Sequence, residues 1–148
     1  MNTEYIAGLR LFNRFYTSVI GLLDKQYLNS EFSLTEVRIL YELAHHPEGM
    51  TAKDLTQLLG LDKGYLSRML QVFERKELVI RKQSDTDKRT FFLYLSPEGN
   101  KVFAGLNDAS QQHAADLLSS MGEDEAAKLI GHMDAIRNIF ENSAISKK

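Results

Sequence analysis

Residues 55–79 read LTQLLGLDKGYLSRMLQVFERKELV and contain two helical patterns separated by a short turn. Gly60 lies where the first helix needs a C-terminal residue with positive φ, and Asp62 is a good N-cap for the second helix. The inward face of the second helix is predicted to carry Leu66, Leu70 and Phe73, with Met69 beside them. Two helices joined by about three or four residues around a glycine are typical of a helix-turn-helix.

A capping pattern opens this helix pair and also an earlier helix. Thr51 precedes Asp54 by three residues, and Ser33 precedes Glu36 in the same way, so a hydroxyl and a carboxylate can satisfy the free amides of each helix start. The helix after Thr51 is predicted to bury Leu55, Leu58 and Leu59. The helix after Ser33 is predicted to carry Val37, Leu40, Tyr41 and Ala44 and to end before Pro47.

After Leu78 the hydrophobic period changes from that of a helix to that of a strand. Residues 79–82 (VIRK) and 89–95 (RTFFLYL) predict the two strands of a hairpin, with a polar tip at residues 83–88. A helix-turn-helix followed directly by such a hairpin predicts a winged helix, in which the hairpin is the wing.

Amphipathic helices are predicted on both sides of this unit. The N-terminal helix has an apolar stripe of Ile6, Leu9, Phe12, Tyr16, Val19 and Leu23. Ser96 and Pro97 open a helix with Val102, Leu106, Ala109, His113 and Leu117. After a break at Gly122, the acidic residues 123–125 open a last helix with Leu129, Met133, Ile136 and Phe140. We expect these stripes to pair with each other and with a second copy of the chain; packing on their own winged unit is the alternative.

The expected fold is therefore mainly α-helical with a small β-hairpin wing. A length of 148 residues fits a single domain, residues 1–148. Within it, residues 33–96 form the expected winged helix-turn-helix unit. The helices of residues 1–28 and 97–143 form the expected dimerisation region.

The net charge of −2 is unevenly distributed along the chain. Residues 51–90 carry a net charge of +3, and the remainder carries −5. A basic middle inside an acidic chain is typical of a local phosphate-binding surface. Chance variation in a modest number of charges is the alternative explanation.

The stretch 55–79 resembles the helix-turn-helix of MarR-type transcriptional regulators. Asp87-Lys88-Arg89, followed by residues 93–99 (LYLSPEG), is similar to the wing motif of that family. The resemblance implies a repressor that binds double-stranded DNA as a homodimer and is relieved by a small-molecule ligand. A symmetric dimer is expected to read a pseudo-palindromic operator.

Two details qualify this resemblance. Residues 59–70 (LGLDKGYLSRML) also resemble the MarR-type domain of acetyltransferase-fused regulators. The regulatory part of such a fusion is therefore an alternative function, although the chain of 148 residues has no room for an acetyltransferase domain. Glu77 stands where the family often carries Gly at the end of the recognition helix. Because Glu adopts positive φ reluctantly, we expect this helix to end differently here.

If Leu66, Leu70 and Phe73 face the core, the opposite side of their helix can face DNA. The candidate contact residues on it are Lys63, Gly64, Tyr65, Ser67, Arg68, Gln71 and Arg75. Arg68 can read guanine through two parallel donors, and Gln71 can read adenine. Lys63 and Ser67 suit phosphates, and Gly64 permits close approach of the backbone. The alternative is an ordinary solvated helix face.

The wing adds a second set of candidates: Arg81, Lys82, Asp87, Lys88 and Arg89. By the resemblance, Arg89 enters or flanks the minor groove, and Asp87 orients either the tip or the arginine. A narrow A·T-rich minor groove has an enhanced negative potential that attracts a guanidinium. An ion pair of Arg89 with Asp85 or Asp87 is the alternative role.

The residues do not identify an effector. The resemblance implies a small anionic or aromatic ligand, a metal or thiol oxidation, and the absence of cysteine excludes the last. Candidate ligand-pocket residues, equally suited to the core or a dimer seam, are Tyr16, Tyr41, Arg10, Arg14 and Arg38. Glu42 with His46, and His113 with Asp116, pair possible metal ligands on one helix face, but no further ligands are evident and no metal site is expected.

Other function classes lack support in the sequence. There is no G-x-S-x-G elbow, phosphate-binding loop or His-Glu-x-x-His pair, so neither an enzyme nor a cofactor is expected. Apolar runs fall short of the ~18 residues of a membrane span, and charges interrupt the N-terminal apolar pattern, so we expect a cytoplasmic protein without a signal peptide or membrane partner. A winged helix used for protein–protein contact is the alternative function, although Arg68, Gln71 and Arg89 are not needed there.

Overall fold

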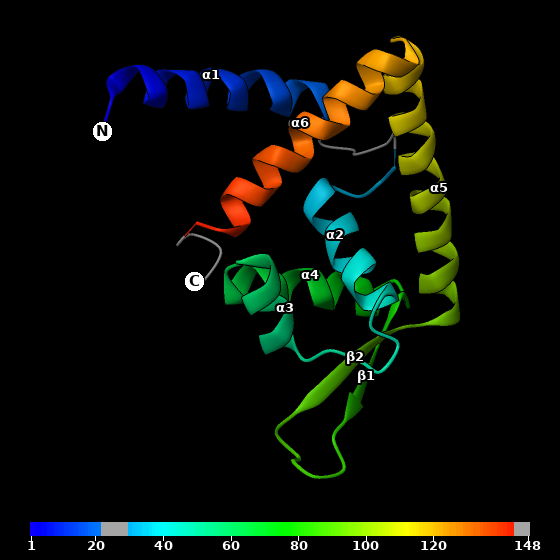
Figure 1. Cartoon of the computed structure of the whole chain (residues 1–148). Helices are drawn as coiled ribbons and strands as arrows, with labels where there is room; N and C mark the ends of the chain where they lie inside the picture. The colour runs from blue at the N-terminus through cyan, green and yellow to red at the C-terminus, as the bar shows by residue number, and fades with distance from the viewer. Residues whose placement is uncertain (22–29, 144–148) are drawn as a thin grey trace. The chain divides into compact units, whose positions relative to one another are not determined.

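The computed structural model describes residues 1–21 and 30–143. In these ranges the elements are α1 (Thr3–Val19), α2 (Leu34–Ala44), α3 (Ala52–Leu59), α4 (Lys63–Arg75), β1 (Val79–Gln83), β2 (Phe91–Leu95), α5 (Pro97–Ser119) and α6 (Glu123–Glu141) (Figure 1). The chain divides into two compact units, Met1–Ala109 and Ser110–Lys148. This order confirms the predicted mainly helical fold with a two-stranded hairpin.

The predicted caps form at the starts of α2 and α3. Ser33 Oγ accepts a bond from the Glu36 amide, and the Glu36 carboxylate accepts one from the Ser33 amide, both at 3.2 Å. Thr51 and Asp54 form the same reciprocal pair at 3.1 Å. These bonds satisfy amides that a helix start leaves without partners, which fixes where each helix begins.

The turn between α3 and α4 also agrees with the prediction. Gly60 ends α3 in the left-handed conformation, with φ of 63°. Asp62 caps α4 by accepting a bond from the Tyr65 amide at 3.0 Å. The buried side chains of α4 are Leu66, Leu70 and Phe73, as predicted.

One predicted core residue in α3 is wrong. Leu55 is fully buried and Leu59 is half-buried, but Leu58 is 50% exposed. A helix of eight residues turns only a narrow line of side chains toward the core, and Leu58 lies beside that line.

The end of α4 differs from expectation because Glu77 does adopt the left-handed conformation, with φ of 59°. The Leu78 amide donates to the Phe73 carbonyl at 2.9 Å, and the Glu77 amide donates to the Glu74 carbonyl at 3.0 Å. These paired bonds are those of a Schellman motif. The helix therefore ends as a glycine would end it, with glutamate in the glycine's position.

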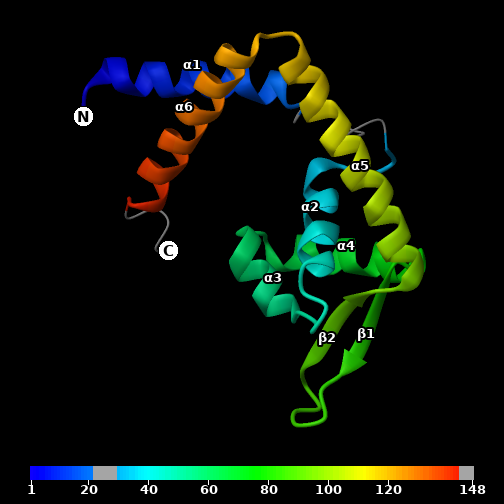
Figure 2. The ribbon, with the colours of Figure 1, turned by 45° about the vertical axis from the view of Figure 1, so that its right-hand side comes forward.

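The wing is an antiparallel pair in which Val79 lies opposite Leu95 and Gln83 opposite Phe91. The second strand was predicted to begin at residue 89, but it begins at Phe91. Thr90 belongs to the turn, because its amide donates to the Asp87 carbonyl at 3.0 Å. In both ribbon views the turn of the hairpin extends beyond helices α3 and α4 (Figures 1 and 2).

The core of the first unit lies between α2, α3, α4, the wing and the start of α5. Its buried apolar side chains are Phe32, Ile39, Leu40, Leu43, Met50, Leu55, Leu66, Leu70, Phe73, Leu78, Val79, Leu93 and Leu106. Within the described ranges, helices α1 and α6 have no buried residues. Leu23 and the rest of residues 22–28, predicted to continue the first helix, lie outside the described residues.

Candidate nucleic-acid interface

The candidate face of α4 lies on the side opposite its buried leucines. Lys63, Gly64, Ser67, Arg68, Gln71 and Arg75 are exposed, and Tyr65 is half-buried. Asp62 caps the start of α4, and the following turns of the helix carry the cationic and amide side chains of this face. The predicted residues of α4 are therefore together on one accessible surface.

Three polar side chains on this face are available to bind a partner. In the described part of the chain, the side chains of Arg68, Gln71 and Arg75 make no hydrogen bond or ion pair within the protein. Gly64 lies beside this set, since a Cβ built on it would come within 3.5 Å of Arg68 Nη1. Guanidinium and amide groups without internal partners can form paired bonds to base edges.

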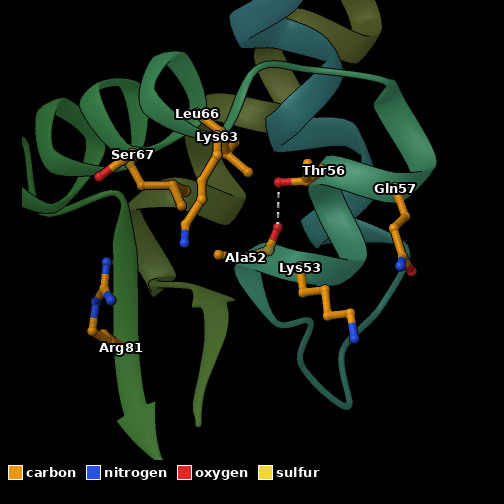
Figure 3. Close-up of a pocket in the computed structure, with 9 residues that line it drawn as sticks. Ala52, Lys53, Thr56, Gln57, Lys63, Leu66, Ser67 and Arg81 are labelled. Carbon is orange, nitrogen blue, oxygen red and sulfur yellow. Dashed lines mark hydrogen bonds between the residues drawn. The ribbon is translucent and has the colours of Figure 1, made fainter. Parts of the chain in front are cut away.

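A hollow of about 440 Å³ lies between α3, α4 and β1 (Figure 3). It is lined by Ala52, Lys53, Thr56, Gln57, Lys63, Leu66, Ser67, Leu70 and Arg81. Figure 3 shows Lys63 and Arg81 extending into this space from α4 and β1. Two cations from separate elements thus face one cavity with an apolar floor.

A second hollow of about 290 Å³ adjoins the first at the base of the wing. It shares Ala52, Lys53 and Arg81 with the first hollow and extends to Arg89 in the hairpin turn. We call Lys53, Lys63, Arg81 and Arg89 the basic groove. These side chains come from α3, α4, β1 and the hairpin turn, and phosphate is the ligand such a set attracts.

Lys53 is a candidate contact that the sequence reasoning missed. In the sequence it is only the second residue of a short helix, next to the capping residue Asp54. Its exposure could be predicted from that position. Its nearness to Arg81 could not, because 28 residues separate the two along the chain.

The wing turn leaves its arginine unpaired. Asp87 does not bind the Arg89 guanidinium; its carboxylate accepts bonds from the Arg89 amide at 3.0 Å and the Thr90 hydroxyl at 3.2 Å. No ion pair joins Arg89 to Asp85 or Asp87 in the described structure. Asp87 therefore shapes the turn, and the side chains of Lys82, Lys88 and Arg89 are exposed and make no hydrogen bond or ion pair to other described residues.

Arg81, unlike Arg89, makes contacts with two neighbouring elements. Its Nε donates to Glu74 Oε1 at 2.7 Å, which joins β1 to α4. Its guanidinium carbon lies 5.7 Å from the centre of the Phe91 ring on β2. Arg81 is thus held in place at the base of the wing.

The effector candidates on α2 form a cluster among themselves. The Arg38 Nε donates to the buried Glu42 carboxylate at 2.8 Å, and its guanidinium lies 5.7 Å from the Tyr41 ring centre. Tyr41 stacks on His45 with 4.0 Å between ring centres. Neither hollow described above is lined by Tyr41, Arg38 or the three candidates on α1.

In the two residue pairs that could offer metal ligands, His46 Nδ1 lies 4.0 Å from the Glu42 carboxylate, and His113 Nε2 is buried without a hydrogen-bond partner among the described residues. His46 Nδ1 lies 2.7 Å from the Glu42 carbonyl, and Asp116 accepts a bond from Gln112 at 2.8 Å. Among the described residues, no three His, Asp or Glu side chains lie together as a metal site would need. In those same ranges, no helix is long and apolar enough to cross a membrane.

The comparisons of this chain with a family model and with curated proteins indicate the same family. A model described as MarR family matches residues 30–90. The transcriptional regulator MhqR of Bacillus subtilis is 30% identical over 124 residues, covering 80% of this chain and 83% of that protein. The regulator MgrA of Staphylococcus aureus is 25% identical over 134 residues, covering 90% and 85%.

Solved structures share the fold. The apo form of MarR from E. coli superposes with a TM-score of 0.73 at 22% identity, covering 86% of this chain and 94% of that one. MepR of S. aureus, crystallised with DNA, superposes with a TM-score of 0.68 at 19% identity, covering 93% and 98%. The two-stranded hairpin after the second helix of the pair is therefore the wing of a winged helix.

Proposed function

The chain belongs to the MarR family, it is a transcriptional regulator rather than an enzyme, and we propose that it represses transcription by binding a pseudo-palindromic DNA operator as a homodimer. The observation that carries the proposal is the exposure of two arginines, Arg68 on α4 and Arg89 in the hairpin turn, whose side chains have no partner among the described residues. They belong to the two elements that a winged helix offers to DNA. The protein would act in the cytoplasm, where its operator is accessible.

In this proposal α4 enters the major groove of one half-site. Arg68 reads guanine and Gln71 reads adenine, each through two parallel bonds to a base edge. Lys63, Ser67 and the exposed amides near Gly64 bind phosphates, which position the helix without specifying sequence. Tyr65 and Arg75 flank these contacts along the same surface.

The wing supplies the second contact. Arg89 inserts into or beside the minor groove, and Asp87 holds the turn that presents it. Lys82 and Lys88 add attraction for the DNA backbone, as does Arg81 at the base of the wing. Such contacts make binding strongly dependent on salt concentration.

Residues 33–96 serve as the DNA-binding unit, and the helices of residues 1–28 and 97–143 as the dimerisation region. The exposed apolar side chains of α1 and α6 support this assignment. They include Leu9, Phe12 and Phe15 on α1, and Ile136, Ile139 and Phe140 on α6. Apolar surface of this extent is typical of an interface that the single chain leaves uncovered.

We further propose that a small aromatic or anionic molecule relieves repression. This rests on membership of the family alone, and no residue is assigned to the effector. Once the operator is known, small molecules can be screened for those that release the protein from the operator duplex.

Selection from a random duplex pool, with purified protein at about 150 mM salt, tests the proposal. An inverted repeat with half-sites about one helical turn apart is expected. Enrichment of a single half-site would contradict the dimer. The absence of any enrichment, with only weak salt-sensitive binding, would favour a winged helix that binds another protein.

A further inference from the structure

Glu74 is an acidic residue on the helix proposed to read DNA, and it bonds to Arg81 of the basic groove. It lies in the last turn of α4, and its carboxylate oxygen Oε1 is 2.7 Å from the Arg81 Nε. Its side chain retains 29% exposure, against 41% for Arg81. An acid placed here needs a physical reason, because it should repel a nearby phosphate.

The atoms that form the bond suggest that reason. Arginine has five N–H donors, one on Nε and four on the two terminal nitrogens. Glu74 engages the Nε, and in the described structure no other hydrogen bond uses the guanidinium. The terminal nitrogens therefore stay free, and Arg81 lines both hollows of the basic groove.

A second contact limits how the guanidinium can turn. The Phe91 ring on the neighbouring strand lies 5.7 Å from its central carbon. Held at Nε by α4 and against an aromatic ring by β2, the side chain has few conformations left. A long exposed arginine would otherwise lose considerable rotamer entropy on binding.

We infer that Glu74 is a positioning residue: it orients Arg81 so that the two terminal nitrogens face a phosphate of the DNA backbone between the recognition helix and the wing. Glu74 itself does not touch DNA. The inference rests on the proposed DNA interface and assigns a role to an acid within it.

The two possible roles of Glu74, orienting Arg81 or only neutralising its charge, predict opposite changes in DNA affinity when Glu74 is replaced by alanine. If Glu74 only neutralises Arg81, then Glu74→Ala and Glu74→Gln both strengthen DNA binding. If it orients Arg81, Glu74→Ala weakens binding, by about tenfold for one charge-assisted contact. Glu74→Gln retains most of the affinity, because its amide oxygen can still accept the bond from Nε.

The experiment measures affinity for a mixed-sequence duplex of roughly 30 base pairs, long enough for two half-sites one turn apart, over a range of salt concentrations. Arg81→Ala should lower the salt slope by about 0.9, the value of one phosphate, and Glu74→Ala should lower it by a similar amount. Adding Glu74→Ala to Arg81→Ala should lower neither the affinity nor the salt slope any further. Glu77→Gln, a loss of the same charge three residues away, is the matched control and should leave affinity unchanged or slightly raised.

A readout without DNA separates orientation from loss of folding. The NMR signal of the Arg81 Nε–H should exchange slowly in the wild type and in Glu74→Gln, and quickly in Glu74→Ala, while thermal unfolding shows all variants folded. Tighter binding by Glu74→Ala, or an unchanged salt slope, would overturn the inference. If the wild type itself bound no duplex, the proposed function would fail instead.

Discussion

At the scale of single residues, Glu77 adopts an unfavourable backbone conformation at the junction of the recognition helix and the wing. Its φ of 59° is a conformation that non-glycine residues adopt at a cost of about 1–2 kcal/mol. The surrounding bonds offset this cost. Its carbonyl accepts a bond from the buried Ser96 hydroxyl at 2.6 Å, and the following Leu78 is buried. Tertiary contacts therefore set the end of this helix against the preference of the residue.

Glu77→Gly is predicted to stabilise the protein. Glycine removes the cost of positive φ but loses more chain entropy on folding, so the expected net gain is about 0.5–1 kcal/mol. Urea unfolding measures it. Glu77→Ala is the control, since it removes the same charge but keeps a Cβ at the strained position. A glycine variant no more stable than the alanine variant would contradict this account of the helix end.

Residue-scale predictions from sequence succeeded where the partners are close along the chain. The caps of Ser33 with Glu36 and of Thr51 with Asp54 span three residues, so the pattern alone identifies them. The bond between Glu74 and Arg81 could not be predicted in this way. Its geometry depends on the angle between a helix and a strand, which the spacing of seven residues does not determine.

At the scale of elements, the start of α5 packs unusually closely on the start of the wing. Gly99 is buried, and a Cβ built on it would collide with the backbone carbonyl of Leu78. The Ser96 hydroxyl bonds both the Gly99 amide, at 2.9 Å, and the Glu77 carbonyl. These contacts join the end of the recognition helix, the start of the wing and the start of α5 to one another.

Gly99→Ala is therefore predicted to destabilise the protein by about 2 kcal/mol, because the rigid carbonyl must move to admit the methyl group. Gly105→Ala in the same helix is the matched control. Nothing lies within 4 Å of the Cβ built there, so alanine should stabilise by up to about 1 kcal/mol through helix propensity. Thermal unfolding of both variants measures the difference. Equal effects would show that the close packing at Gly99 has no energetic consequence.

Element types were predictable and some element edges were not. The strand over residues 79–83 agrees closely with the predicted range of 79–82, because it directly follows the end of a helix. The second strand starts two residues late because Asp87 captures the Arg89 amide and the Thr90 hydroxyl in the turn. Aspartate side chains form such bonds in turns, which compete with strand pairing.

At the scale of the whole molecule, α1 keeps large apolar side chains exposed in the described structure. Leu9 is 50% exposed and Phe12 is 43% exposed. At 100° per residue they share one side of the helix, whereas Thr3 and Ala7 lie on the opposite side. If this face belongs to a dimer interface, charges placed on it should be far more harmful than charges placed on the opposite side.

The double variant Leu9→Glu with Phe12→Glu is predicted to be monomeric in analytical ultracentrifugation. It should lose affinity for an inverted repeat and keep weak, salt-sensitive binding to duplex DNA, since a single half-site loses the second set of contacts. Thr3→Glu with Ala7→Glu adds the same charge and should remain dimeric. A dimer that survives the first pair of substitutions would exclude this face from the interface.

Arg68 is proposed to read a base rather than a phosphate, and titration of the wild type and Arg68→Ala with two duplexes distinguishes the two roles. One duplex carries the inverted repeat enriched by selection, and the other carries the same bases shuffled. We expect a loss of at least about fivefold on the repeat, from about 1–3 kcal/mol per paired base contact, with little change on the shuffled duplex. Equal losses on both duplexes, or no loss on either, would contradict it.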